Sequence, residues 1–142
     1  MPPRKDNLSV LITRPEPGAS SLASALIPVG LKPIVAPMIK IRALETITQP
    51  KGLEQGHADA LIFISVPAVQ FGLPVLQEFG LARRQIFAVG PSTATKIRDM
   101  LGGQETPNLA LPTEGFNSEA LLELDDLQAF SVAGQKILIV RG

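Results

Sequence analysis

Short apolar runs without alternation recur along this chain, and each is followed by a loop and then by helical periodicity. The clearest example spans residues 86–98: an apolar run, the loop Gly-Pro-Ser-Thr, and a helical period that includes Ala94 and Ile97. Strands without alternation are buried on both faces, as in a parallel sheet that helices cover on both sides. The pattern therefore predicts an α/β fold with doubly wound parallel sheets.

The same order of strand, loop and helix is expected elsewhere in the chain. The expected strands cover 8–13, 60–64, 86–89, 109–111 and 136–140, and the expected helices cover 19–29, follow residue 67, cover 94–101 and begin at 117 or 118. Apolar stripes such as Leu22, Leu26 and Val29 predict a buried helix face. Pro74 is expected to kink its helix or to cut it short. Leu121, Leu122 and Leu124 are expected to form the apolar side of the last helix.

Two segments interrupt this order. Residues 32–44 are β-rich and contain two prolines, which predicts a strand that runs into a connector. Within it, Met38, Lys40 and Arg42 alternate with Ile39 and Ile41. The last strand reaches Arg141 and Gly142 without a following helix. Because a parallel strand needs a crossover connection, we expect the sequence to end in mid-domain.

Composition limits the possible functions. Among 142 residues, 45% are hydrophobic, and 13 Lys and Arg balance 13 Asp and Glu, so net charge gives no reason to expect nucleic acid or an anionic membrane as a partner. The absence of cysteine excludes disulfides and thiolate metal sites. The single histidine, His57, is expected to be an exposed loop residue at the edge opposite the site. No apolar run reaches the ~18 residues of a membrane span, and we expect a cytoplasmic protein.

The candidate site lies where the predicted parallel strands end, because ligands of such sheets bind beyond the carboxyl ends of the strands. Gly90 permits close backbone approach, and the helix start after it offers free N–H groups that bind anions or ligand oxygens. The strand ends hold Thr13, Arg14, Ser65, Gly90, Ser92, Thr93, Pro112, Thr113 and Arg141.

Each candidate also has a purely structural interpretation. Thr93 and Ser65 could each hydrogen-bond a ligand, or each could cap only the backbone of its own helix. Arg14 could pair with a carboxylate, or it could be a solvated loop charge. Lys96 and Arg98 are expected at the surface.

Six short motifs occur in an order that is characteristic of one family. They are Val-Leu-Ile-Thr-Arg-Pro at 10–15, Pro-Met-Ile-Lys-Ile at 37–41, Ala-Leu-Ile-Phe-Ile-Ser at 60–65, Ala-Val-Gly-Pro-Ser-Thr-Ala at 88–94, Ser-Glu-Ala-Leu-Leu at 118–122 and Ile-Leu-Ile-Val-Arg-Gly at 137–142. With these motifs the chain resembles the N-terminal part of the uroporphyrinogen-III synthase family of tetrapyrrole (haem) biosynthesis. The resemblance implies a cofactor-independent hydro-lyase that closes the linear hydroxymethylbilane into a ring, inverting the last pyrrole and releasing water.

The resemblance also implies two α/β domains with an active site in the cleft between them. Residues 1–37 would be the first segment of domain 1, residues 38–41 the connector, and residues 42–142 a domain 2 that lacks its last helix and strand. The substrate would contact Thr13, Arg14, Ser65, Gly90, Ser92 and Thr93. The full-length enzyme would be a monomer that binds neither nucleic acid nor membrane.

This chain departs from the family pattern in two side chains. Pro67 stands where the family has an asparagine, and the chain contains no tyrosine, although a tyrosine is the acid most often proposed in the family. The catalytic residues are therefore unassigned, and it stays open whether the chain is active by itself.

Three other functions are known for small α/β domains. A phosphoacceptor module would need an aspartate at the carboxyl end of a strand, and a dinucleotide-binding domain would need a Gly-x-Gly-x-x-Gly turn. Neither feature is present at the predicted strand ends. The alternative that stays open is a non-catalytic ligand-binding or interaction module derived from the same fold.

Overall fold

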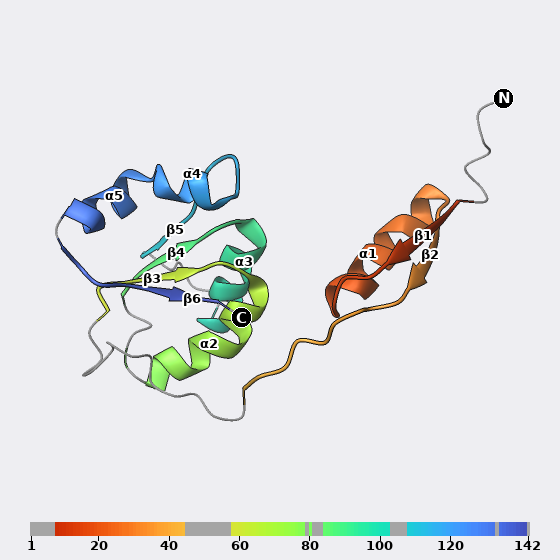
Figure 1. Cartoon of the computed structure of the whole chain (residues 1–142), viewed down its shortest axis with the longest axis horizontal. Coiled ribbons are helices and arrows are strands. Elements are labelled where there is room, and N and C mark those ends of the chain that lie inside the picture. Colours follow the sequence, from red (N-terminus) through yellow and green to blue (C-terminus); the bar gives the residue numbers. More distant parts are fainter. Residues whose placement is uncertain are drawn as a thin grey trace. The chain divides into compact units, whose positions relative to one another are not determined.

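The computed structural model describes residues 8–44, 58–78, 80, 84–102, 108–132 and 134–141. The chain divides into two compact units, Met1–Leu44 and Glu45–Gly142. Each unit contains one parallel sheet, with strand order β1-β2 in the first and β5-β4-β3-β6 in the second (Figure 1). The predicted parallel α/β class is confirmed. The domain bounds drawn from the family resemblance stay predictions.

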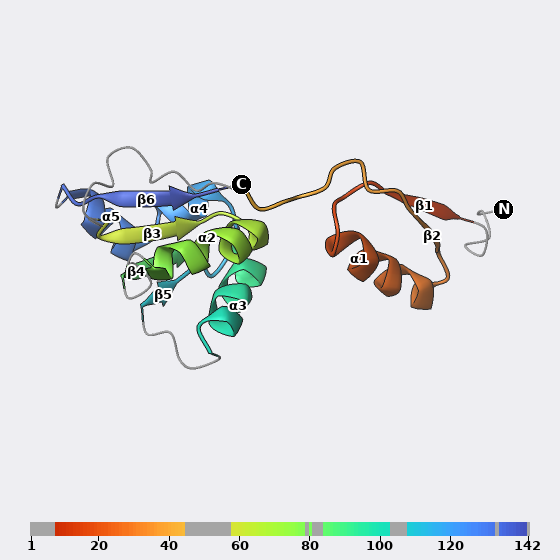
Figure 2. The same cartoon turned by 90° about the horizontal axis from the view of Figure 1, so that it is seen from below.

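The first unit is one helix packed on a pair of strands. Its elements are β1 (Ser9–Ile12), α1 (Gly18–Leu26), the 3-10 turn η2 (Ile27–Val29) and β2 (Lys32–Val35). Gly30 follows the helical turn with φ +80°, the left-handed conformation that glycine adopts without strain. Figure 2 shows α1 lying along one face of the β1-β2 pair. The other face of this small sheet has no helix among the described residues 8–44.

This small sheet buries little apolar surface. Leu11 and Ile34 pair across the ladder and share a face, and they are 62% and 47% exposed. The expected burial of the stripe on α1 is wrong at two positions, since Leu22 and Val29 are exposed. The physical reason is geometric, because one helix on two strands can cover only part of either element.

The strand expected to continue into a connector ends at Val35. Residues 36–44 have no regular secondary structure, and Ile39 and Ile41 are exposed like the residues beside them. The alternation predicted over 38–42 therefore does not produce a buried face and an exposed face, because all five residues are exposed. Alternation produces such faces only where a strand is paired and packed.

The second unit has helices on both faces of its four-stranded sheet (Figure 1). Its elements are β3 (Ala60–Phe63), α2 (Val66–Glu78), β4 (Gln85–Ala88), α3 (Pro91–Met100), β5 (Leu109–Ala110), α4 (Ser118–Leu122), α5 (Asp125–Val132) and β6 (Ile137–Val140). Helices α2 and α3 cover one face of the sheet, and α4 and α5 cover the other. None of the helices in the described part of the chain is long and apolar enough to cross a membrane.

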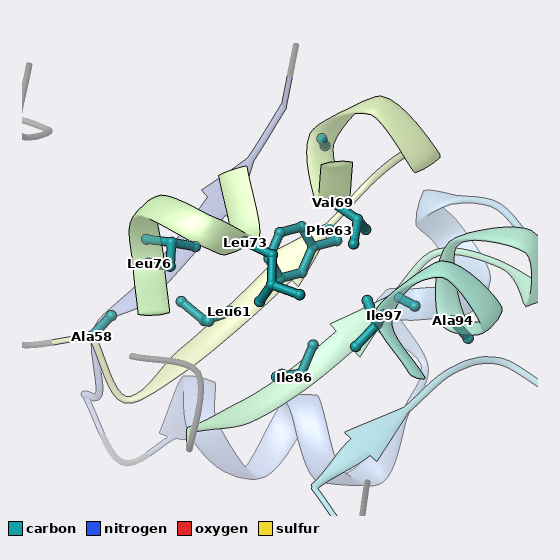
Figure 3. Close-up of a cluster of buried hydrophobic side chains, with 11 residues drawn as sticks. Ala58, Leu61, Phe63, Val69, Leu73, Leu76, Ile86, Ala94 and Ile97 are labelled. Carbon is teal, nitrogen blue, oxygen red and sulfur yellow. The ribbon is translucent and has the colours of Figure 1, made fainter. Parts of the chain in front are cut away.

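Two apolar clusters hold these layers together. On the α2 and α3 side, Phe63 lies beneath Val69 and Leu73, as Figure 3 shows. On the other side, Phe87 packs against the ring of Phe130 in an edge-to-face arrangement with centroids 6.0 Å apart. Successive residues of a strand point to opposite faces of the sheet, so they contribute in turn to the two clusters. A strand that contributes to both clusters must therefore be apolar at every position.

Several helices of this unit differ from expectation. Helix α2 continues past Pro74 to Glu78 and is not cut short there, and Leu73 and Leu76 on either side of the proline are buried against the sheet. Helix α5 was not predicted, although Asp125 in its first turn is a helix-start signal. Leu122, expected on the apolar side of α4, is 63% exposed, since the adjacent Leu121 occupies the buried face of this helix.

At the edge where the strands begin, the side chain of Asp59 links β3 to β6. Asp59 Oδ2 accepts a hydrogen bond of 2.8 Å from the backbone N–H of Lys136, and the N–H of Asp59 donates to the carbonyl of Lys136. These two bonds align the starts of β3 and β6. Asp59 therefore has a structural role at the edge opposite the candidate site.

Gly72 permits the close approach of α2 to β6. An added Cβ would lie 2.5 Å from Val140 Cγ1, a stiff side chain that cannot move away easily. We expect Gly72→Ala to lower the free energy of unfolding by about 1 kcal/mol in urea denaturation, because overpacking exceeds the gain in helix propensity. Gln77→Ala, exposed on the same helix, should change it little. Equal or greater stability of Gly72→Ala would contradict the close packing.

The first unit should open far more readily than the second. Only Ile12 and Ala19 are buried hydrophobic residues within 8–44. We expect the N–H groups of Lys32 and Ala36, which donate to the carbonyls of Leu8 and Ile12, to exchange with solvent at close to unfolded-chain rates. The N–H of Val89, bonded to Phe63, should be strongly protected. Hydrogen exchange followed by NMR tests this contrast, and equal protection in the two units would refute it.

Candidate functional site

The carboxyl ends of β3, β4 and β5 lie side by side at one edge of the sheet, because these neighbouring strands are parallel. Ser65 follows β3, and Gly90 follows β4. The N–H of Val89 donates to the carbonyl of Phe63 over 3.2 Å, so the ladder continues to the point where the loops diverge. We call Ser65, Gly90, Ser92, Thr93 and the loop 111–117 the carboxyl edge. The sequence prediction of strand ends therefore identifies residues that the fold brings to one place.

Ser65 is the cap of helix α2. Its Oγ accepts a hydrogen bond of 3.2 Å from the N–H of Ala68, and its carbonyl accepts from Val69. Ser65 therefore caps its own helix, while its contact with a ligand stays a prediction. This bond uses an oxygen lone pair, so the hydroxyl proton is a separate group that can be donated.

Helix α3 begins with backbone donors and no capping side chain. Gly90 is the N-cap in an extended conformation, with φ −161° and ψ 174°, and Pro91 is the first helical residue. The carbonyl of Gly90 accepts from the N–H of Ala94 at 3.0 Å. The N–H groups of Ser92 and Thr93 belong to the first turn, where helix geometry supplies no partner. Gly90 has no side chain that could accept from them, so they can bind ligand oxygens.

The two hydroxyls of this turn have different surroundings. Ser92 is exposed. Thr93 is 6% exposed and shares the buried face of α3 with Ala94 and Ile97, and it is the one buried polar side chain among the residues that the structure describes. Of the two candidates, Ser92 therefore offers the hydroxyl that solvent and ligands can reach.

Thr13 and Arg14 occupy the carboxyl end of β1, in the first unit. Both are exposed, and the carbonyl of Thr13 accepts a hydrogen bond of 3.1 Å from the N–H of Met38. The guanidinium of Arg14 lies over Gly18 at the start of α1, where an added Cβ would be 2.7 Å from Nε. The guanidinium of Arg14 can lie there because Gly18 has no side chain. The sequence pattern did not predict this role of Gly18.

A carboxylate in the same loop has a structural function. Glu16 Oε2 accepts from the N–H of Ser20 at 3.1 Å, and Oε1 accepts from its hydroxyl at 2.9 Å. The side chain thus satisfies the first turn of α1, which Pro17 at the N-cap position does not.

The other polar residues considered from the sequence do not extend the site. His57 lies outside the described residues. Arg98 is exposed as expected, while Lys96 is half-buried. Within the described ranges, no group of three or more histidine, cysteine, aspartate or glutamate residues could hold a metal ion.

Comparison with known proteins gives a consistent result. The family described as uroporphyrinogen-III synthase HemD matches residues 20–142. Curated relatives, each named uroporphyrinogen-III synthase, come from Salmonella typhimurium strain LT2, Proteus mirabilis and Escherichia coli strain K12, and they are 33%, 30% and 29% identical over 140 residues. The alignments cover 95% of this chain and 54%, 67% and 54% of the respective relatives. The chain therefore spans little more than half the length of the Salmonella and Escherichia proteins.

The cap at Ser65 can be tested separately from ligand binding. Ser65→Ala removes the acceptor for the N–H of Ala68 and should lower the free energy of unfolding by about 1 kcal/mol. Ser65→Asn keeps a capping oxygen and should stay close to the original stability. Thermal denaturation followed by circular dichroism measures both variants. Equal stability of the alanine and asparagine variants would contradict the capping role.

Proposed function

Because the chain belongs to the uroporphyrinogen-III synthase family, we propose that it acts in the ring closure of hydroxymethylbilane to uroporphyrinogen III. The supporting observation is that the matched segment, residues 20–142, contains every residue of the carboxyl edge. The substrate is thus a flexible chain of four pyrroles that carries carboxylates. Its partner groups on the protein should be hydrogen-bond donors held in place by rigid elements.

The proposed reaction breaks one C–O bond and one C–C bond of the substrate and forms two new C–C bonds within it. The hydroxyl group at one end leaves with a proton as water, and the other end attacks the carbon that it leaves. Inversion of the last pyrrole proceeds through a spiro intermediate, in which one α-carbon of that ring holds both bridging carbons. The older of these two C–C bonds then breaks and forms again at the other α-carbon, whose proton is released and balances the proton lost with the water. Because the pyrroles supply the nucleophile and stabilise the developing positive charge, the protein mainly has to hold the ends together and place donors correctly.

The carboxyl edge has donors suited to this task. The N–H groups of Ser92 and Thr93 point out of a helix start that carries a partial positive charge of roughly one half. The hydroxyls of Ser92 and Ser65 add further donors. In the first unit, the guanidinium of Arg14 suits a carboxylate by its paired N–H groups. These are local donors, which a chain of zero net charge requires in order to bind an anion.

The remaining features of the proposal follow from composition and family. We infer that the substrate rather than nucleic acid is the partner, since the balanced charge offers no footprint for a polyanion. We also infer a monomeric, cytoplasmic enzyme, with residues 1–37 in one domain, 38–41 in a connector and 42–142 in the other domain.

An isomer assay tests the proposed activity. The chain is incubated with freshly made hydroxymethylbilane, and the products are oxidised and separated by chromatography into type I and type III porphyrins. We expect type III product above the level of a reaction without protein, with the Escherichia coli relative as positive control. Type I product alone, formed at the spontaneous rate, would refute synthase activity of this chain.

A pair of hydroxyl variants then tests the site. Ser92→Ala removes an exposed donor from the carboxyl edge and should lower kcat/KM about fivefold, the value of one hydrogen bond. Thr95→Ala removes an exposed hydroxyl from the same helix, beyond the first turn, and should leave kcat/KM unchanged. Equal effects of the two substitutions would contradict a specific role of Ser92.

A further inference from the structure

Phe116 has an unusual backbone conformation and an exposed aromatic ring. Among the described residues it is the one residue other than glycine with a positive φ, at +28°. Such a conformation costs free energy for a bulky side chain. The side chain is also 49% exposed, so burial does not repay that cost in full. Because both its backbone conformation and its exposure are unfavourable, we look for a role of Phe116 other than packing in the core.

The turn around Phe116 is held on both sides. Gly115 precedes it with φ +80°, and an added Cβ there would lie 3.1 Å from the Cβ of Ala120. Asn117 follows it and caps α4, since its Oδ1 accepts from the N–H of Ala120 at 2.8 Å. The backbone of Phe116 therefore cannot relax without breaking this cap or the close approach of Gly115.

The turn places Phe116 beside the start of α3. A Cβ added to Gly90 would lie 3.4 Å from the Cβ of Phe116 and 3.9 Å from its Cγ. Gly90 is the residue that precedes the free N–H groups of Ser92 and Thr93. An exposed aromatic side chain thus adjoins the donors of the carboxyl edge.

We propose that Phe116 is a substrate-binding residue, whose ring packs against one pyrrole ring of the tetrapyrrole while the donors of α3 bind a carboxylate of that ring. The proposal rests on the proposed function. Each pyrrole of the substrate combines a flat aromatic face with acidic side chains, so a matching site needs an aromatic surface next to anion-binding groups. Phe116 and the start of α3 supply these two parts in adjacent loops.

A structural role would be a hydrophobic staple. A residue just before an N-cap often packs against the fourth residue of its helix, which would pair Phe116 with Leu121. Leu121 is buried in the cluster beneath α4 and α5, whereas about half of Phe116 is exposed to solvent, so a staple would bury its ring only in part. The staple and the binding role differ in their consequences, because only the staple would make the ring necessary for stability.

Two variants at position 116 separate the ring from the backbone. Phe116→Asn removes the ring and introduces a residue that tolerates positive φ, whereas Phe116→Tyr keeps an aromatic ring. Leu122→Asn is the matched control, because it removes another exposed apolar side chain from the same region. Binding of uroporphyrinogen III under anaerobic conditions is measured by titration calorimetry, and the melting temperature of each variant is recorded.

We expect Phe116→Asn to weaken product binding about fivefold without lowering the melting temperature, and Phe116→Tyr and Leu122→Asn to bind like the original chain. Unchanged binding by Phe116→Asn, or a melting temperature that falls while binding is retained, would overturn the proposal and leave the proposed function standing. Absence of product binding by the original chain would refute the proposed function, and the role of Phe116 with it.

Discussion

Strand β3 pairs with a parallel neighbour on each side, β4 and β6, and all four of its residues are buried. Its backbone groups must therefore find partners in those neighbours, because burial removes water as an alternative. The parallel direction that these bonds impose brings the loops after β3, β4 and β5 to one edge. The pairing of β3 with β4 brings Ser65 beside the donors of α3, and the pairing of β4 with β5 brings the ring of Phe116 to the same edge.

The sequence predicts the second unit well, because its strands are short, continuous apolar runs. Such strands are stable only in a sheet that is covered on both faces. Residues 60–64, 86–89 and 136–140 correspond to β3, β4 and β6 to within one residue at each end. Helix α5 was missed, since its eight residues carry only a weak apolar stripe. In the first unit, periodicity identified side chains able to be buried, such as Leu22. Periodicity does not show whether another helix or strand is present to cover these side chains.

The site is predictable in position and less so in detail. The rule that ligands bind at the carboxyl ends of parallel strands leads to Ser65, Gly90 and Ser92. It does not separate Ser92 from Thr93, since one residue along a helix turns the side chain by about 100° and decides which is buried. The sequence does not indicate Phe116 as a candidate, because its proposed role depends on a backbone angle. Gly115, beside it, was the signal of an unusual turn.

The bonds between Asp59 and Lys136 join residues that are 77 positions apart in the sequence. During synthesis, one edge of β3 has no partner until β6 has left the ribosome. A central apolar strand with a free edge is a template for pairing with other chains. The order of the strands thus makes the nascent protein most prone to aggregation in the interval before residues 137–140 emerge, and a chaperone that shields β3 would act in that interval.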